Sequence, residues 1–246
     1  MEVLGIRIDN LSREETLEKI EGFLAGNKLC QIATINPEFI LAAQKDEEFK
    51  SILNSCDLNI ADGVGIKFAF WKLGFQKLKT RIAGVDLMEE ILKIANGRGL
   101  GVYLVANKDG LSTWEETRDA ILKKYPNLKI EGINIDKHTS GYRLQVSGYG
   151  IVFCNFGAPF QEKFLHSLKS QENGKIKLAM GVGGSFDYLT GKVKRAPRRM
   201  RQIGLEWLFR LIQQPNRICR ILNATIIFPI KIIFNNNKYD SQSQVN

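Results

Sequence analysis

The chain has 246 residues, of which 44% are hydrophobic and 25% charged, a balance that excludes a fibrous or wholly disordered protein. Its formal net charge is +9 at pH 7, and nearly all of this excess lies between residues 192 and 220, where nine basic residues accompany one acidic residue. The charge therefore predicts an anionic partner for the C-terminal part: a nucleic acid, a phospholipid surface or a polyphosphate.

The four cysteines are scattered without a C-x-x-C pair, which favours free thiols in a reducing compartment. Charged residues interrupt the segment from Arg7 to Glu14, so that no apolar signal sequence is evident. We therefore expect the protein to stay in the cytoplasm.

The N-terminal part predicts a helix, a strand and a second helix. Ser12 and Glu15 form a capping box ahead of apolar residues at helical spacing. An apolar run at 29–34 then predicts a strand, and Asn36 before Pro37 is typical of the start of a helix.

Strand and helix patterns alternate through the rest of the core. Asp86 with Glu89, and Ser112 with Glu115, predict two further helix starts. The sequence predicts strands at 57–61, 101–106, 128–135, 151–156 and 176–182. This alternation predicts an α/β fold, a mainly parallel, Rossmann-like sheet with helices on both faces.

Four polar turns follow predicted strands, and ligands of such sheets bind beyond the carboxyl ends of the strands. The turns are Thr34 with Asn36, Asp62 with Gly63, Gly157 to Gln161, and Gly183 to Asp187. Each turn alone is more often a cap or a tight turn than a site, but four together predict one. Asp62 could remove a proton from an attacking hydroxyl, or it could simply form a turn with Gly63.

The stretch from Gly181 to Pro197 places a glycine loop directly before basic residues. Gly183 and Gly184 allow the backbone to approach a ligand closely, and Ser185 and Asp187 can hydrogen-bond a sugar or a base. A tight turn is the alternative interpretation. We expect the lysines and the arginine at 192–195 to lie on a connector rather than to touch a sugar.

The C-terminal part predicts an amphipathic helix at 201–213, followed by an apolar run at 218–234. Arg220, Pro229 and Lys231 interrupt that run. It is too short and broken to span a bilayer, because a spanning helix needs about 20 apolar residues. A position in the lipid headgroup region is one interpretation, and docking onto the core or a subunit interface is the other.

Several kinds of site are missing from the sequence. Two histidines and scattered cysteines predict no zinc site, and no D-x-D pair is present to hold a divalent ion, so we expect neither a metal site nor a cofactor. The chain also lacks a P-loop and a G-x-G-x-x-G fingerprint.

Five ordered motifs resemble those of the WecG/TagA/CpsF glycosyltransferases, glycosyltransferase family 26, over nearly the whole chain. They are TINPE at 34–38, NIADGVG at 59–65, RIAGVD at 81–86, GAPFQEK at 157–163, and GVGGSFDYLTGKVKRAP at 181–197 with GLEWL at 204–208. Each motif alone is weak, but their shared order is specific.

The resemblance implies an inverting, metal-independent transfer of N-acetylmannosamine, or a related sugar, from a UDP donor. The implied acceptor is undecaprenyl-diphosphate-linked N-acetylglucosamine at the inner face of the cell membrane, in cell-wall or surface polysaccharide synthesis. Another UDP-hexose such as UDP-glucose is an alternative donor. A basic nucleic-acid-binding module is the alternative from a different class, although no nucleic-acid motif is present.

The resemblance also implies roles for individual residues. Asp62 matches the general base, and Thr34, Asn36, Arg81 and Gln161 match further catalytic-pocket residues. The residues that match the binding site for the UDP-sugar donor are Gly183, Gly184, Ser185, Asp187, Arg210, Arg217 and Arg220.

We therefore expect a catalytic core at 1–195, a basic appendage at 196–234 that contacts the cytoplasmic membrane surface, and a disordered tail at 235–246. The expected partners are the UDP-sugar and the polyprenyl-diphosphate-linked acceptor, without nucleic acid. A homo-oligomer is also compatible with the sequence, which does not determine the oligomeric state.

Overall fold

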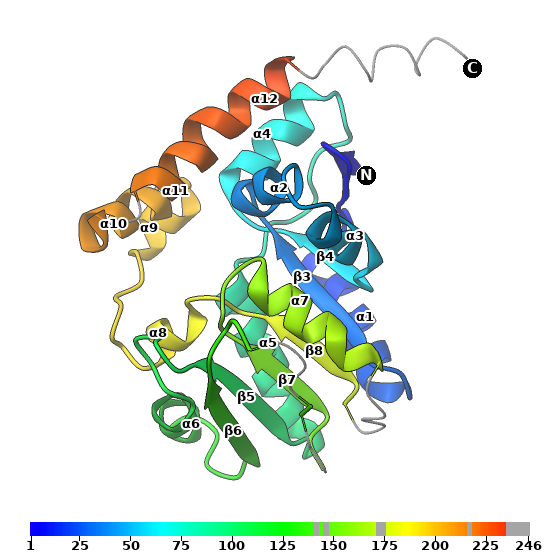
Figure 1. The fold of residues 1–246 in the computed structure, drawn as a ribbon, viewed down its shortest axis with the longest axis vertical. Helices are drawn as coiled ribbons and strands as arrows, with labels where there is room; N and C mark the ends of the chain where they lie inside the picture. Colours follow the sequence, from blue (N-terminus) through cyan, green and yellow to red (C-terminus); the bar gives the residue numbers. More distant parts are fainter. Residues whose placement is uncertain (140–142, 145–147, 171–175, 216–217, 235–246) are drawn as a thin grey trace.

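The protein, seen as a computed structural model, is described at residues 1–139, 143–144, 148–170, 176–215 and 218–234 (Figure 1). Its centre is a six-stranded sheet with the order β4-β3-β8-β7-β5-β6, in which every neighbouring pair is parallel. The strands are β3 (Cys30–Ile35), β4 (Leu58–Ala61), β5 (Val102–Asn107), β6 (Ile130–Ile135), β7 (Ile151–Cys154) and β8 (Leu178–Gly181). A separate antiparallel ribbon joins β1 (Glu2–Val3) and β2 (Ile6–Arg7). The predicted parallel α/β sheet is thus confirmed.

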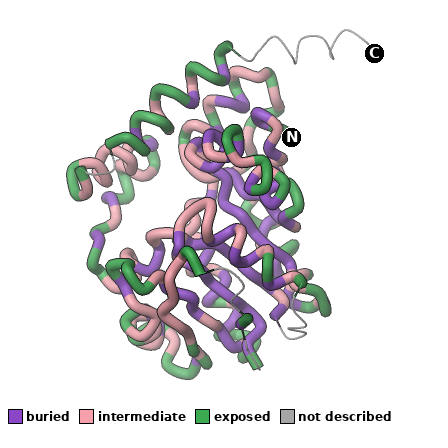
Figure 2. The backbone as a smooth tube through the Cα atoms, viewed as in Figure 1, coloured by how far each residue is buried: buried purple, intermediate pink, exposed green. Residues whose placement is uncertain are grey.

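Helices cover both faces of the sheet, and their apolar sides form the core. One face packs against α1 (Arg13–Ala25), α5 (Gly84–Arg98), α6 (Trp114–Leu122) and α8 (Ser185–Leu189). The other face packs against α2 (Pro37–Ala43), α3 (Glu47–Ser55), α4 (Val64–Lys72) and α7 (Phe160–Ser167), which a short 3-10 turn, η1 (Leu168–Ser170), extends. Strands β3, β4, β7 and β8 are buried along their whole length, whereas the edge strand β6 is partly exposed (Figure 2).

Two of the four predicted helix starts agree with the structure. Ser12 caps α1 through the full capping box with Glu15, and the Asn36 side chain accepts the backbone N–H of Phe39 at the start of α2. The other two predictions were wrong. Thr113, not Ser112, caps α6.

The predicted cap at Asp86 fails for a tertiary reason. Helix α5 begins at Gly84, so Asp86 lies inside its first turn rather than before it. The Asp86 carboxylate instead receives both terminal nitrogens of Arg195, each at 2.6 Å. A side chain paired in this way cannot cap its own helix.

The C-terminal part forms a chain of short helices that arches beside the core (Figure 1). They are α9 (Arg198–Gln202), α10 (Glu206–Gln213), α11 (Ile218–Leu222), the π-helical turn η3 (Asn223–Ile227) and α12 (Phe228–Phe234). The prediction of one helix over 201–213 was wrong, because Gly204 adopts a φ of 81° that ends α9. A Cβ at Gly204 would lie 2.3 Å from Cγ1 of Val64, so this turn also packs closely on α4.

Only a few C-terminal side chains join the core. Phe228 and Ile232 are fully buried in the cluster that includes α2, α3 and α4. In contrast, α10 has no buried residue. The expected tail at 235–246 lies outside the described residues.

Candidate active site

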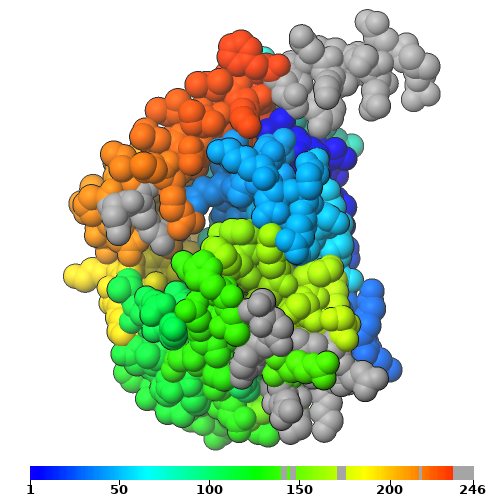
Figure 3. Space-filling model, in the orientation of Figure 1, coloured from blue at the N-terminus to red at the C-terminus, as the bar shows by residue number. Residues whose placement is uncertain are grey.

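A cavity of about 460 Å³ lies beyond the carboxyl ends of the strands. Its walls come from the loops after β3, β4, β5, β7 and β8, and α9 to α11 contribute the opposite side. Figure 3 shows the hollow between the C-terminal helices in orange and the core in blue and green. The position agrees with the rule for ligands of parallel sheets.

Asp62 follows β4 directly and faces this cavity. Its backbone N–H donates to the carbonyl of Ile35 at 2.7 Å, which ties the end of β4 to the end of β3. Burial first, and then the negative charge of Glu206, raise the pKa of the Asp62 carboxyl to about 6. Arg81 and Arg210 act in the opposite direction by favouring the carboxylate. Asp62 can therefore be ionised at neutral pH and still accept a proton readily.

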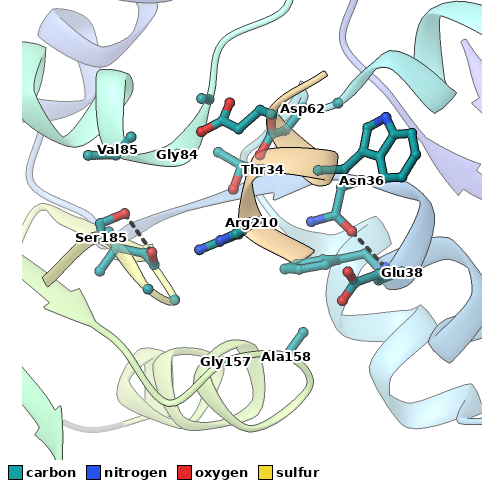
Figure 4. Close-up of a pocket in the computed structure, with 18 of the residues that line it drawn as sticks. Thr34, Asn36, Glu38, Asp62, Gly84, Val85, Gly157, Ala158, Ser185 and Arg210 are labelled. Atoms are coloured by element: carbon teal, nitrogen blue, oxygen red, sulfur yellow. Dashed lines mark hydrogen bonds between the residues drawn. The ribbon is translucent and has the colours of Figure 1, made fainter. Parts of the chain in front are cut away.

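Thr34 and Asn36 project from the end of β3 beside Asp62. The Thr34 side chain is buried, and a Cβ on Gly84 would lie 3.3 Å from its Oγ1, so the start of α5 packs tightly on it. Asn36 accepts the N–H of Phe39 through Oδ1 at 3.1 Å. Figure 4 shows its other amide atom turned toward the cavity, which leaves a donor available to a ligand.

The predicted glycine loop forms the wall across from Asp62. Gly183 has a φ of 49°, in the left-handed region. The Ser185 hydroxyl donates to the carbonyl of Val182 at 2.6 Å, so that this hydroxyl serves the turn itself. Asp187 accepts the Ser112 hydroxyl at 2.8 Å. This bond gives Ser112 a role that its sequence position did not reveal.

Arg210 reaches this glycine loop from α10. Its guanidinium carbon lies 5.1 Å from the centre of the Tyr188 ring. Its Nη2 is only 2.9 Å from where a Cβ on Gly184 would stand, so a side chain at this position would displace the guanidinium. Figure 4 places Arg210 near Thr34 and Asp62, between Ser185 and Glu38. The cation is thus held beside the glycine loop, where it could bind an anionic ligand.

The remaining predicted arginines differ in their surroundings. Arg81 lines the cavity and donates to the carbonyl of Arg201 at 3.1 Å. Arg220 also lines it, and its Nε donates to the Glu38 carboxylate at 2.7 Å. Arg217 lies outside the described residues. Arg220 is therefore partly neutralised by an acidic side chain of the core, whereas Arg81 bonds a backbone carbonyl.

Several cavity residues were not predicted. Arg195 was expected on a connector, but it lines the cavity in its ion pair with Asp86. Glu206 and Glu38 line it as well, and both lie inside the GLEWL and TINPE motifs, which was the available signal. Asn155 lines the cavity after β7 and accepts the N–H of Asn107 at 2.7 Å.

Two negative findings concern the described part of the chain. No three His, Cys, Asp or Glu side chains there gather in a way that could hold a metal ion. None of the helices within those residues combines the length and apolar character needed to cross a membrane.

Comparison with known proteins gives consistent matches. The model of the family described as "Glycosyl transferase WecG/TagA/CpsF family" matches residues 1–242. The chain is 34% identical over 196 residues to the N-acetylglucosaminyldiphosphoundecaprenol N-acetyl-beta-D-mannosaminyltransferase of Bacillus subtilis (strain 168), covering 78% of this chain and 75% of that relative. It is 31% identical over 238 residues to the protein of the same name from Staphylococcus aureus (strain MRSA252), covering 94% and 91% of the two chains. The matched residues include both the sheet and the C-terminal helices.

Proposed function

The chain belongs to the WecG/TagA/CpsF family of glycosyl transferases, and we propose that it transfers N-acetylmannosamine from UDP to N-acetylglucosaminyl-diphosphoundecaprenol. The observation that carries the proposal is the convergence of Asp62, Arg81 and Arg210 in one cavity that the Gly183–Gly184 loop also lines. A base and a phosphate-binding wall in one cavity suit the transfer of a sugar from a diphosphate.

The proposed step is a single displacement with inversion at the sugar carbon. The Asp62 carboxylate takes the proton of an acceptor hydroxyl while that oxygen attacks C1 of the donor sugar. The bond between C1 and the β-phosphate oxygen breaks, and UDP leaves with the bonding electrons. Arg81, Arg210 and Arg220 offset the negative charge that grows on the diphosphate, in a role that a divalent metal fills in other enzymes.

Thr34 and Asn36 lie beside Asp62 and are placed to orient the acceptor. The free donor of the Asn36 amide can bond a sugar oxygen, because its Oδ1 is already used at the start of α2. The loop from Gly183 to Asp187 would hold UDP. Arg217, next in sequence to the described part of α11, is proposed to act with Arg220.

The experiment is a transfer assay with a panel of UDP-sugars and a short-chain lipid-diphosphate-linked N-acetylglucosamine. We expect the N-acetylmannosamine donor to give a disaccharide product of inverted configuration in the presence of EDTA. Selective use of UDP-glucose would favour the alternative donor, and loss of activity in EDTA would contradict metal-independent transfer. Asp62→Asn is the control for catalysis, since it should bind UDP without turning over.

We further propose that the C-terminal helices bind the cytoplasmic face of the cell membrane, where the lipid acceptor lies. Apolar side chains stay exposed along this part of the chain: Ile212, Ile226, Ile227, Ile230, Ile233 and Phe234 are between 42% and 80% exposed. Lys231 is exposed on α12 beside these apolar residues, and Arg198 and Arg199 are exposed on α9. Apolar side chains combined with basic ones are typical of segments that lie on anionic lipid surfaces.

Replacement of exposed apolar residues tests this membrane contact without disturbing the core. The double variant Ile230→Ser and Ile233→Ser should lose most of its flotation with anionic vesicles, whereas its thermal stability should stay close to wild type. Unchanged vesicle binding would argue against the contact. Vesicle flotation is compared with DNA binding by the wild-type protein at the same salt concentration. Binding to DNA without binding to vesicles would assign the basic helices to a nucleic-acid-binding module.

A further inference from the structure

The start of α7 carries two buried polar side chains, Gln161 and Glu162, that are 3% and 1% exposed. Oε1 of Gln161 accepts two backbone N–H groups, from Gly157 at 3.1 Å and from Gly183 at 3.0 Å. Gly157 belongs to the loop after β7, and Gly183 to the loop after the neighbouring strand β8. One side-chain amide therefore joins two loops that line the cavity.

Glu162 determines which way that amide faces. Its Oε1 accepts Nε2 of Gln161 at 2.6 Å, so the amide nitrogen points at the carboxyl and the amide oxygen at the two glycines. If the carboxyl were absent, the buried amide nitrogen would lose its acceptor, and the two glycine N–H groups alone would hold the Gln161 side chain in place.

Two neighbouring strands accommodate and anchor this pair. A Cβ on Gly181, the last residue of β8, would lie 2.4 Å from Nε2 of Gln161 and 2.6 Å from Oε1 of Glu162. Only glycine is therefore compatible with the pair at this position. From β3, Gln31 donates to the Glu162 carbonyl at 3.1 Å and anchors the first turn of α7.

The carboxyl is held in its neutral form. Burial raises the pKa of Glu162 to about 8, which keeps the carboxyl protonated at neutral pH. Oε2 has no hydrogen-bond partner among the described residues, which suits the protonated oxygen of a carboxylic acid better than a buried charge. The neutral acid still offers Oε1 as an acceptor to Gln161.

We propose that Glu162 is a positioning residue for the donor site: acting through Gln161, it holds the loops after β7 and β8 at the spacing that a nucleoside diphosphate requires. The inference rests on the proposed function for the identity of the ligand. Glu162 itself touches neither the donor nor the reacting atoms, because Gln161 and the glycine loops stand between it and the cavity.

The test compares Glu162→Met with Glu162→Gln, using UDP as the probe and calorimetry as the readout. Methionine fills similar space without an acceptor, whereas glutamine keeps an oxygen that can accept from Gln161. We expect Glu162→Met to weaken UDP binding about tenfold, since the buried amide nitrogen of Gln161 loses its acceptor and the side chain that joins both loops is no longer held in place. Glu162→Gln should stay within about twofold of wild type.

A double-mutant cycle separates positioning from packing. Gln161→Met should weaken UDP binding about as much as Glu162→Met, and the double variant should be no worse than either single variant, because the carboxyl acts only through the amide. Thr117→Val is the matched control, since it removes a buried hydroxyl from α6 that bonds the Thr113 carbonyl and neither loop. It should leave UDP affinity unchanged.

The outcomes distinguish this inference from the proposed function. Failure of the wild-type protein to bind UDP would overturn the proposed function. Tight UDP binding by the wild type, with equal affinity in Glu162→Met and Glu162→Gln, would overturn the positioning role alone. If Glu162→Met does not fold, Gln161→Met carries the test, and its unchanged UDP affinity would refute the inference.

Discussion

Acidification should lower the transfer rate because the proposed base must be ionised to accept a proton. With a pKa of about 6 for Asp62, the ionised fraction is about 90% at pH 7 and about 10% at pH 5. The rate should therefore fall about ninefold between these two values and level off above about pH 7. The acid limb of kcat/KM, measured with a short-chain acceptor, reports the pKa of this group in the free enzyme.

Glu206→Gln provides a structural control on the same measurement. Since the charge of Glu206 raises the pKa of Asp62, removal of that charge should lower the pKa and move the acid limb to lower pH. A limb that arises from the substrates would not move. Asp62→Asn should reduce the plateau rate by about 100-fold to 10,000-fold, because the general base is gone.

Two results would refute this reasoning about Asp62. One is an acid limb that stays in place, or moves to higher pH, in Glu206→Gln. The other is a near-wild-type plateau rate in Asp62→Asn with intact fold. The first result would contradict the electrostatic coupling between α10 and Asp62, and the second would contradict the assignment of Asp62 as the base.

Three further predictions address stability and the cations of the site. Glu162 has a pKa raised above its value in the unfolded chain, so the stability it contributes is fully present below about pH 4.5 and is lost as the pH rises through about 8. The melting temperature of the wild type should therefore fall relative to Glu162→Gln over this range, and parallel curves would contradict the buried acid. Glu38→Gln frees Arg220 from its ion pair and should tighten UDP binding about two- to fivefold by calorimetry, whereas weaker binding would show that Glu38 itself assists the ligand. Ser12→Ala removes the cap of α1 and should cost about 1 kcal/mol in denaturant unfolding with unchanged transfer, and a loss of activity in the folded variant would be unexpected.

The sequence alone was sufficient for the architecture and for one half of the site. Alternating strand and helix patterns predicted the parallel sheet, because buried parallel strands need helical crossovers. The turns with Thr34, Asp62, Gly157 and Gly183 all follow strands, and parallel strands end at one edge of the sheet. That geometry alone predicted that these residues would meet, as they do in the cavity.

Local patterns failed where a distant partner competes for the same side chain. Ser112 and Thr113 are equally suited to cap a helix, and the hydrogen bond from Ser112 to Asp187 leaves Thr113 to do so. The sequence around Asp86 is typical of a helix cap, but its carboxylate pairs with Arg195, which is remote in sequence. A helix pattern likewise cannot show that Gly204 must turn to clear Val64.

The charges of the site were decided by the tertiary structure. The sequence placed a basic run after the glycine loop, but the fold determines that Arg210 reaches Gly184 and that Arg220 meets Glu38. The raised pKa of Asp62 depends on burial and on Glu206 from α10, which no local pattern encodes. Hydrophobic periodicity is a property of the local sequence and can be read from it directly. Electrostatic interactions depend on distances between residues that only folding brings together.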